Sequence, residues 1–211
     1  MTIRAVPRHR RGRTESTGGA GGNERLTAMT GAVLLALLAV EGVTVVFKQQ
    51  LLTLHFFIGM LLIGPVLLKV CSTGYRFVRY YTGAVPYVGK GPPALLLRVL
   101  GPVVIATSVG VIGSGIALAI TGPHDSQWIF LHKATFILWF GAMAVHVLWY
   151  APQLPRLLRN GSSARDQAKA ALAGAGRRWM LLLGAIAIGL VIALATYHLA
   201  GPWNNLRSLH G

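Results

Sequence analysis

Five apolar stretches constrain this sequence more than any other feature. A helix needs about 20 residues to cross a hydrocarbon core about 30 Å thick, and each stretch is that long. None shows the alternation of apolar and polar residues that a membrane barrel needs. The sequence therefore predicts an all-α integral membrane protein with a bundle of five transmembrane helices. The expected spans are residues 27–47, 51–70, 99–121, 128–150 and 179–199.

The composition excludes several other classes of protein. A net charge of +15 is typical of nucleic-acid binders, but 54% of the residues are hydrophobic and only 12% are charged. We therefore expect a lipid bilayer as the surroundings and no nucleic acid as a partner. The single cysteine, Cys71, excludes an internal disulfide, an iron–sulfur cluster and a CxxCH haem attachment. Five acidic residues leave little room for a two-carboxylate hydrolytic site.

The distribution of basic residues predicts the orientation in the membrane. Of the 20 Lys and Arg residues, 17 lie before the first span, in the link from Lys69 to Arg98, or between the fourth and fifth spans; the exceptions are Lys48, Lys133 and Arg207. Basic loops are cytoplasmic, so we expect the N-terminus inside and the C-terminus outside a bacterial plasma membrane. On this reading residues 1–26 form a disordered basic cytoplasmic tail, residues 27–199 the membrane domain and residues 200–211 a short outer tail.

Two histidines lie at matched depth in the second and fourth spans. His55 and His132 each follow the start of their span by four residues, which places both about 6 Å below the outer boundary. Polar residues inside a membrane are costly and usually functional. Two neutral imidazoles at one depth on two helices are what axial ligation of a haem iron requires. The alternative is that both histidines are hydrogen-bonded packing residues or members of a proton relay.

The segments around these histidines resemble a known class of membrane protein. They read LHFFIGMLL around His55 and LHKATFILWFGAMAVHVLWY from His132 to beyond His146. This pattern is similar to small bacterial b-type cytochrome subunits and ferric-reductase-like transmembrane domains. The resemblance implies haem b, with His55 and His132 as its axial ligands. It also implies electron transfer involving a quinone or a periplasmic or flavin-containing redox partner.

The inner half of the bundle departs from that pattern. His146 follows His132 by 14 residues on the same helix face, but the matching position on the second span is Lys69. We therefore expect one haem and no second bis-histidine haem. His146 with Lys69 is interpreted as a polar site near the inner face, either a candidate for a quinone head group or simple packing.

Two further residues are candidates for the site around the outer histidines. Glu41 lies about 9 Å deep, close to the level of His55 and His132. Because a ligating histidine usually donates its second ring nitrogen to a carboxylate or carbonyl, Glu41 is a candidate acceptor. The alternative is a pair with Lys48 or Lys133. Gly59, one turn after His55, is a candidate for leaving space beside a macrocycle.

Two classes of function follow from these features. The first is a membrane-embedded electron-transfer subunit rather than a self-contained enzyme, because the sequence shows no nucleotide-binding motif. The second is a non-redox membrane protein, a transporter component or an assembly factor, whose intramembrane His and Glu residues relay protons or pack. Few spans and no inverted repeat argue against a complete transporter.

Overall fold

The computed structural model describes residues 20–89, 95–150 and 174–204. These residues form helices and no strand. The five long helices are α1 (Ala20–Val46), α2 (Lys48–Tyr81), α4 (Leu95–Thr121), α5 (Ser126–Tyr150) and α8 (Ala175–Thr196). Two short elements accompany them, α3 (Val85–Val88) and the 3-10 helix η2 (Tyr197–Ala200).

The prediction of five membrane-crossing helices is confirmed. All five are long and apolar enough to span a bilayer, and many of their large apolar side chains face outward. Phe130, Ile137 and Val191, for example, are each about two-thirds exposed or more. Outward apolar surface on this scale is unfavourable in water and suits lipid. The chain is therefore an all-α, multi-pass membrane protein.

The helices extend beyond the apolar spans at several ends. Residues 20–26, which we expected in the disordered tail, are the first two turns of α1. They are held there because Leu26 is buried and the Asn23 side-chain amide donates to the Ser72 carbonyl of α2, 2.9 Å away. Helical structure likewise continues to Asn204, although we expected the outer tail to begin at residue 200. The rest of both tails, residues 1–19 and 205–211, lies outside the described residues.

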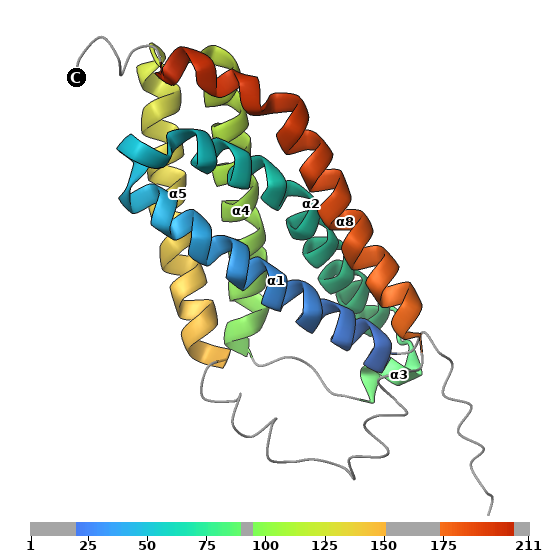
Figure 1. Cartoon of the computed structure of the whole chain (residues 1–211). Helices are drawn as coiled ribbons and strands as arrows, with labels where there is room; N and C mark the ends of the chain where they lie inside the picture. Colours follow the sequence, from blue (N-terminus) through green and yellow to red (C-terminus); the bar gives the residue numbers. More distant parts are fainter. Residues whose placement is uncertain (1–19, 90–94, 151–173, 205–211) are drawn as a thin grey trace, which may run out of the picture.

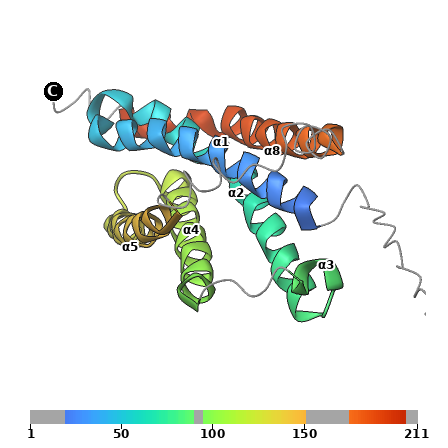
Figure 2. The same cartoon turned by 90° about the horizontal axis from the view of Figure 1, so that it is seen from below.

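The helices form two groups (Figures 1 and 2). Helices α1, α2 and α8 lie side by side with α2 packed against both neighbours, and α4 and α5 form a separate antiparallel pair. One end of the bundle holds the C-terminal end of α1 and the N-terminal ends of α2 and α5. We call it the histidine end, and the opposite end, where α1 and α8 begin, the basic end.

The backbones of α2 and α8 lie in close contact where the two helices cross. A side chain at Gly64 would clash with the Ala185 carbonyl, and one at Gly189 would clash with the Leu61 carbonyl. Small residues allow helices in membranes to approach closely enough for dispersion contacts between backbones. These two glycines therefore set the distance between α2 and α8.

A short turn fixes the register of α4 against α5. Helix α4 ends at Thr121 and is followed by Gly122, whose φ of 84° suits a residue without a Cβ. Asp125 then caps α5, because its Oδ1 accepts from the backbone N–H groups of Gln127 and Trp128 at 3.1 and 3.2 Å. Further along the pair, the Trp139 indole N–H donates to the Ser108 hydroxyl at 3.0 Å.

A small apolar core joins the two groups of helices near the histidine end. Met60 of α2, Ala119 of α4 and Ala193 of α8 are buried against one another. Partly buried neighbours, Phe56 and Ile116 among them, pack around this core. Because Phe56 follows His55 and Ile116 follows Gly115, the core holds the backbones that carry the candidate site.

Candidate histidine site

The structure brings His55 and His132 together at the histidine end. His55 lies two turns into α2 and His132 two turns into α5. Their ring centres are 6.3 Å apart, with an angle of 67° between the ring planes. The backbones of α2 and α5 are not among the closely packed helix pairs of the described chain. The two side chains therefore reach toward each other from helices that otherwise lie apart.

The imidazole of His55 is held from α1. Its Nδ1 lies 2.8 Å from Glu41 Oε1 and 3.2 Å from the Thr44 hydroxyl. The same hydroxyl lies 3.0 Å from Glu41 Oε2, and Thr44 is fully buried. When the Glu41 carboxylate is ionised it can only accept hydrogen bonds, and His55 Nδ1 is then the donor of this contact.

The imidazole of His132 is held from α4. Its Nδ1 lies 3.1 Å from the Val111 carbonyl oxygen and 3.2 Å from the Ser114 hydroxyl. A carbonyl oxygen only accepts, so Nδ1 carries the proton and donates it. In a neutral ring the lone pair then lies on Nε2. Ser114 is itself fixed by Thr135, whose hydroxyl lies 3.0 Å away.

Gly115 is what lets the His132 ring reach the α4 backbone. A Cβ at this position would lie 3.0 Å from Cε1 and 3.4 Å from Nδ1 of His132, which is tighter than ordinary van der Waals contact. Since Gly115 has no side chain, the ring can approach the carbonyl of Val111 one turn earlier. The glycine therefore supports the hydrogen bond that fixes the His132 tautomer.

Glu41 contacts one of the two candidate histidines, His55, as we expected. Its carboxylate pairs with His55, whereas Lys48 and Lys133, the alternative partners, are both exposed. Gly59 lies beside the same carboxylate: a Cβ there would be 3.6 Å from Glu41 Oε1. This is ordinary contact distance, so Gly59 borders the Glu41 carboxylate.

Lys69 and His146 lie toward the basic end, away from the histidine pair. The Lys69 ammonium donates to the Thr27 carbonyl of α1 at 2.6 Å, and Gly31 leaves room for it, since a Cβ there would lie 3.0 Å from Nζ. His146 lies on α5, in the half of that helix nearer the basic end. A joint site of His146 and Lys69 stays a prediction.

The donor groups near the histidine pair are few. Within the described ranges, no group of three or more His, Cys, Asp or Glu residues is arranged to hold a metal ion. His198, which we expected at the membrane interface, is exposed. The histidine pair therefore offers two ring nitrogens rather than a complete coordination shell.

Sequence reasoning missed the residues that orient the two rings. Thr44, the Val111 carbonyl, Ser114 and Gly115 did not stand out as site residues. Thr44 has a signal in hindsight, because it lies three residues after Glu41 and so on the same helix face. Ser114 and Gly115 belong to a run of small residues that ordinary helix packing explains equally well.

Comparison with known proteins gives no assignment. No family model, no curated protein and no solved structure matches this chain. The site must therefore be interpreted from its own chemistry.

Proposed function

We propose that this chain is a membrane-embedded electron-transfer subunit that binds one haem b between α2 and α5, with His55 and His132 as axial ligands. The observation that carries the proposal is the use of Nδ1 on both rings. Each Nδ1 faces an acceptor, Glu41 for His55 and the Val111 carbonyl for His132. Metal-ligating histidines have this arrangement, in which one nitrogen is held by a carboxylate or carbonyl and the other is left for the metal.

The spacing of the rings fits the same interpretation. Transition metals bond imidazole nitrogen at about 2 Å, and the ring centre lies about 1 Å behind that nitrogen. Two imidazoles on opposite sides of one metal therefore have centres about 6 Å apart, and the observed separation is 6.3 Å. Edge-to-face packing of two neutral rings covers the same range, so the spacing supports the proposal without carrying it.

The donor set favours haem over a bare metal ion. A haem needs at most two ligands from the protein, because the macrocycle supplies the other four. Two histidines suffice for haem and are too few for the structural metal sites of proteins, which usually take four protein ligands. When bound, the haem supplies one-electron oxidation and reduction.

The residues around the pair have distinct roles in this proposal. Glu41 and Thr44 hold His55 and place negative charge beside it, while Val111 and Ser114 orient His132. We further propose a bacterial plasma membrane with the basic end in the cytoplasm, because basic loops are retained there. A quinone head group near Lys69 and His146, and a periplasmic or flavin-containing partner, are the candidate electron-exchange partners.

Optical spectroscopy tests the proposal. The full chain, expressed with ample haem supply and purified in detergent, should show a b-type spectrum that sharpens on reduction by dithionite. The expected stoichiometry is one haem per chain. A colourless protein, folded by circular dichroism and unable to take up added haemin, would overturn the proposal.

A second candidate function is proton transfer without redox chemistry. The observation that favours it is the polar cluster at the histidine end, where Glu41 and Thr44 contact His55 and the His55 ring lies edge-on to the ring of His132. Imidazoles change protonation near neutral pH and act as proton shuttles. Haem-free protein in liposomes would then conduct protons in a pH-dye assay, and Glu41→Gln would reduce the rate. Proton flux equal to that of empty liposomes would exclude this alternative.

A further inference from the structure

The segment that follows α8 lies against the start of α2 at the histidine end (Figure 1). We call residues 197–204, which comprise η2 and the helical turn after it, the C-terminal cover. The side-chain amide of Asn204 donates to the Thr53 hydroxyl of α2 at 3.0 Å. The centre of the Trp203 ring lies 6.1 Å from that of Phe56. The cover is therefore attached to the first two turns of α2 by a hydrogen bond and a ring contact.

These contacts place the cover beside the histidine pair. Thr53 and Phe56 lie on either side of His55 in the sequence of α2. Helix η2, the first half of the cover, also packs against α4, the helix whose Val111 carbonyl holds the ring of His132. The cover therefore contacts the helix that carries one candidate ligand and the helix that orients the other.

Trp203 of the cover carries a buried hydrogen-bond donor that lacks an acceptor. Its indole Nε1 is buried and has no hydrogen-bond partner among the residues that the structure describes. Buried indole N–H groups usually find a partner, and Trp139 does so by donating to the Ser108 hydroxyl. Because an unpaired buried donor is unfavourable, we expect the acceptor for Trp203 to belong to a bound ligand.

We propose that the Trp203 indole N–H donates to a propionate carboxylate of haem b. This inference rests on the proposed function, because it names a further residue of the same site. Haem b carries its propionates on one edge of the macrocycle, and ionised carboxylates are unfavourable inside an apolar span. That edge therefore faces the membrane surface at the histidine end, where the cover lies. A carboxylate is a strong acceptor, so it matches a buried donor that has no other partner.

Other acceptors suit this position less well. An ordered water needs two or more polar partners when it is buried, but Phe56, the ring neighbour of Trp203, belongs to the apolar core. A lipid head group stays at the bilayer surface, whereas Trp203 Nε1 is enclosed by protein. A haem between α2 and α5 approaches the cover from within the bundle.

Binding of haemin and of its dimethyl ester tests this proposal. The ester keeps the iron and the macrocycle but has no ionised carboxylate. Each compound is titrated into the haem-free full-length protein in detergent, and its affinity is read from the absorption of the bound form. Trp203→Phe should weaken haemin binding about tenfold or more, as expected for loss of a hydrogen bond to a charged group. It should leave ester binding unchanged, which also shows that the variant is folded.

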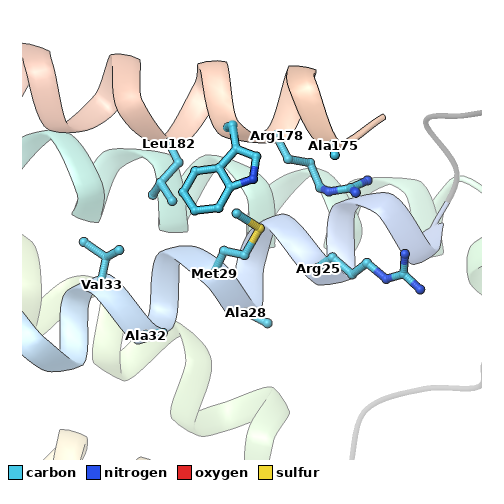
Figure 3. Close-up of a pocket in the computed structure, with 9 residues that line it drawn as sticks. Arg25, Ala28, Met29, Ala32, Val33, Ala175, Arg178 and Leu182 are labelled. Carbon is cyan, nitrogen blue, oxygen red and sulfur yellow. The ribbon is translucent and has the colours of Figure 1, made fainter. Parts of the chain in front are cut away.

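Two control variants separate the indole donor from packing. Trp179 is exposed and lines a mostly apolar groove between α1 and α8 at the basic end, together with Met29 and Leu182 (Figure 3). Trp179→Phe should therefore change neither affinity. Asn204→Ala removes the hydrogen bond of the cover to α2 and keeps the indole, so any loss of affinity should be equal for haemin and its ester.

The outcomes distinguish this proposal from the proposed function. Haemin binding by Trp203→Phe that equals the wild type would overturn the role of Trp203. Equal weakening of haemin and ester binding would also overturn it, because the indole would then act through packing or through a water. A wild-type chain that binds neither compound would instead overturn the proposed function itself.

Discussion

The carboxylate of Glu41 contacts the imidazole of His55, with Oε1 2.8 Å from Nδ1, across the short turn between α1 and α2. Both residues lie in apolar spans, where an isolated charge is unfavourable. The pair therefore satisfies two costly groups at once, and it sets which nitrogen of His55 faces away from α1. This contact explains why a carboxylate can lie inside an apolar span.

The first prediction concerns the Glu41 carboxylate. A negative charge near the haem stabilises its more positive, oxidised state. Glu41→Gln keeps the size of the side chain and removes that charge. The midpoint potential should therefore rise on the order of 60 mV, which corresponds to a tenfold change for a one-electron couple. Potentiometric titration measures this rise, with Glu24→Gln as the control, and an unchanged midpoint potential would exclude a role for Glu41 beside the haem.

The second prediction concerns the glycine beside His132. Gly115→Leu should displace the ring, because even a Cβ would lie 3.0 Å from Cε1, and the variant should lose most of its bound haem. Gly113 lies on the same helix, and a Cβ there would have nothing within 4 Å, so Gly113→Leu should retain haem. Comparison of the pyridine haemochrome content of the two purified variants makes the measurement. Equal haem in both would remove Gly115 from the site.

The third prediction concerns the crossing of α2 and α8. Gly64→Ala and Gly189→Ala each place a methyl group against a backbone carbonyl, Ala185 and Leu61 respectively, which a backbone cannot avoid by rotation. Overpacking typically costs about 1–3 kcal/mol, and we expect the upper part of that range. Gly184→Ala, with open space at its Cβ, should cost little. Thermal unfolding in detergent compares the three, and a Gly64→Ala variant as stable as Gly184→Ala would contradict this crossing.

The fourth prediction concerns orientation in the membrane. In a Cys71→Ala background, a cysteine at Ser126 should react with an impermeant maleimide added to intact cells, and a cysteine at Thr82 should react only after lysis. Both positions are exposed; Ser126 begins α5 at the histidine end, and Thr82 follows α2 at the basic end. The asymmetry of the basic loops is the physical reason. Labelling in the reverse order would invert the assignment of inside and outside.

Much of the fold could be predicted from the sequence because membrane spans are long and have an unambiguous composition. The helix ends could not, since they depend on tertiary contacts. Residues 20–26 have the composition of a polar tail, and their helical structure depends on contacts such as the hydrogen bond from Asn23 to the Ser72 carbonyl. The long extension of α2 to Tyr81 likewise lies beyond the apolar span.

The candidate site divides in the same way. Matched depth along two helices was enough to pair His55 with His132, and to suggest Glu41 as a partner. Depth says nothing about rotation of a helix around its axis, and it is the rotation of α4 that presents the Val111 carbonyl and Ser114 to His132. The separation of α4 and α5 from the other three helices is also a packing outcome that span lengths do not encode.

The fifth prediction is the most direct test of the central claim that His55 and His132 hold one haem. The reduced-minus-oxidised spectrum and the haem-to-protein ratio should be measured for the wild-type chain and for single alanine variants at four histidines. We expect one haem per chain in the wild type, loss of the b-type spectrum in His55→Ala and His132→Ala, and no change in His146→Ala and His198→Ala. A spectrum that survives in both His55→Ala and His132→Ala, or a second haem lost in His146→Ala, would contradict the account.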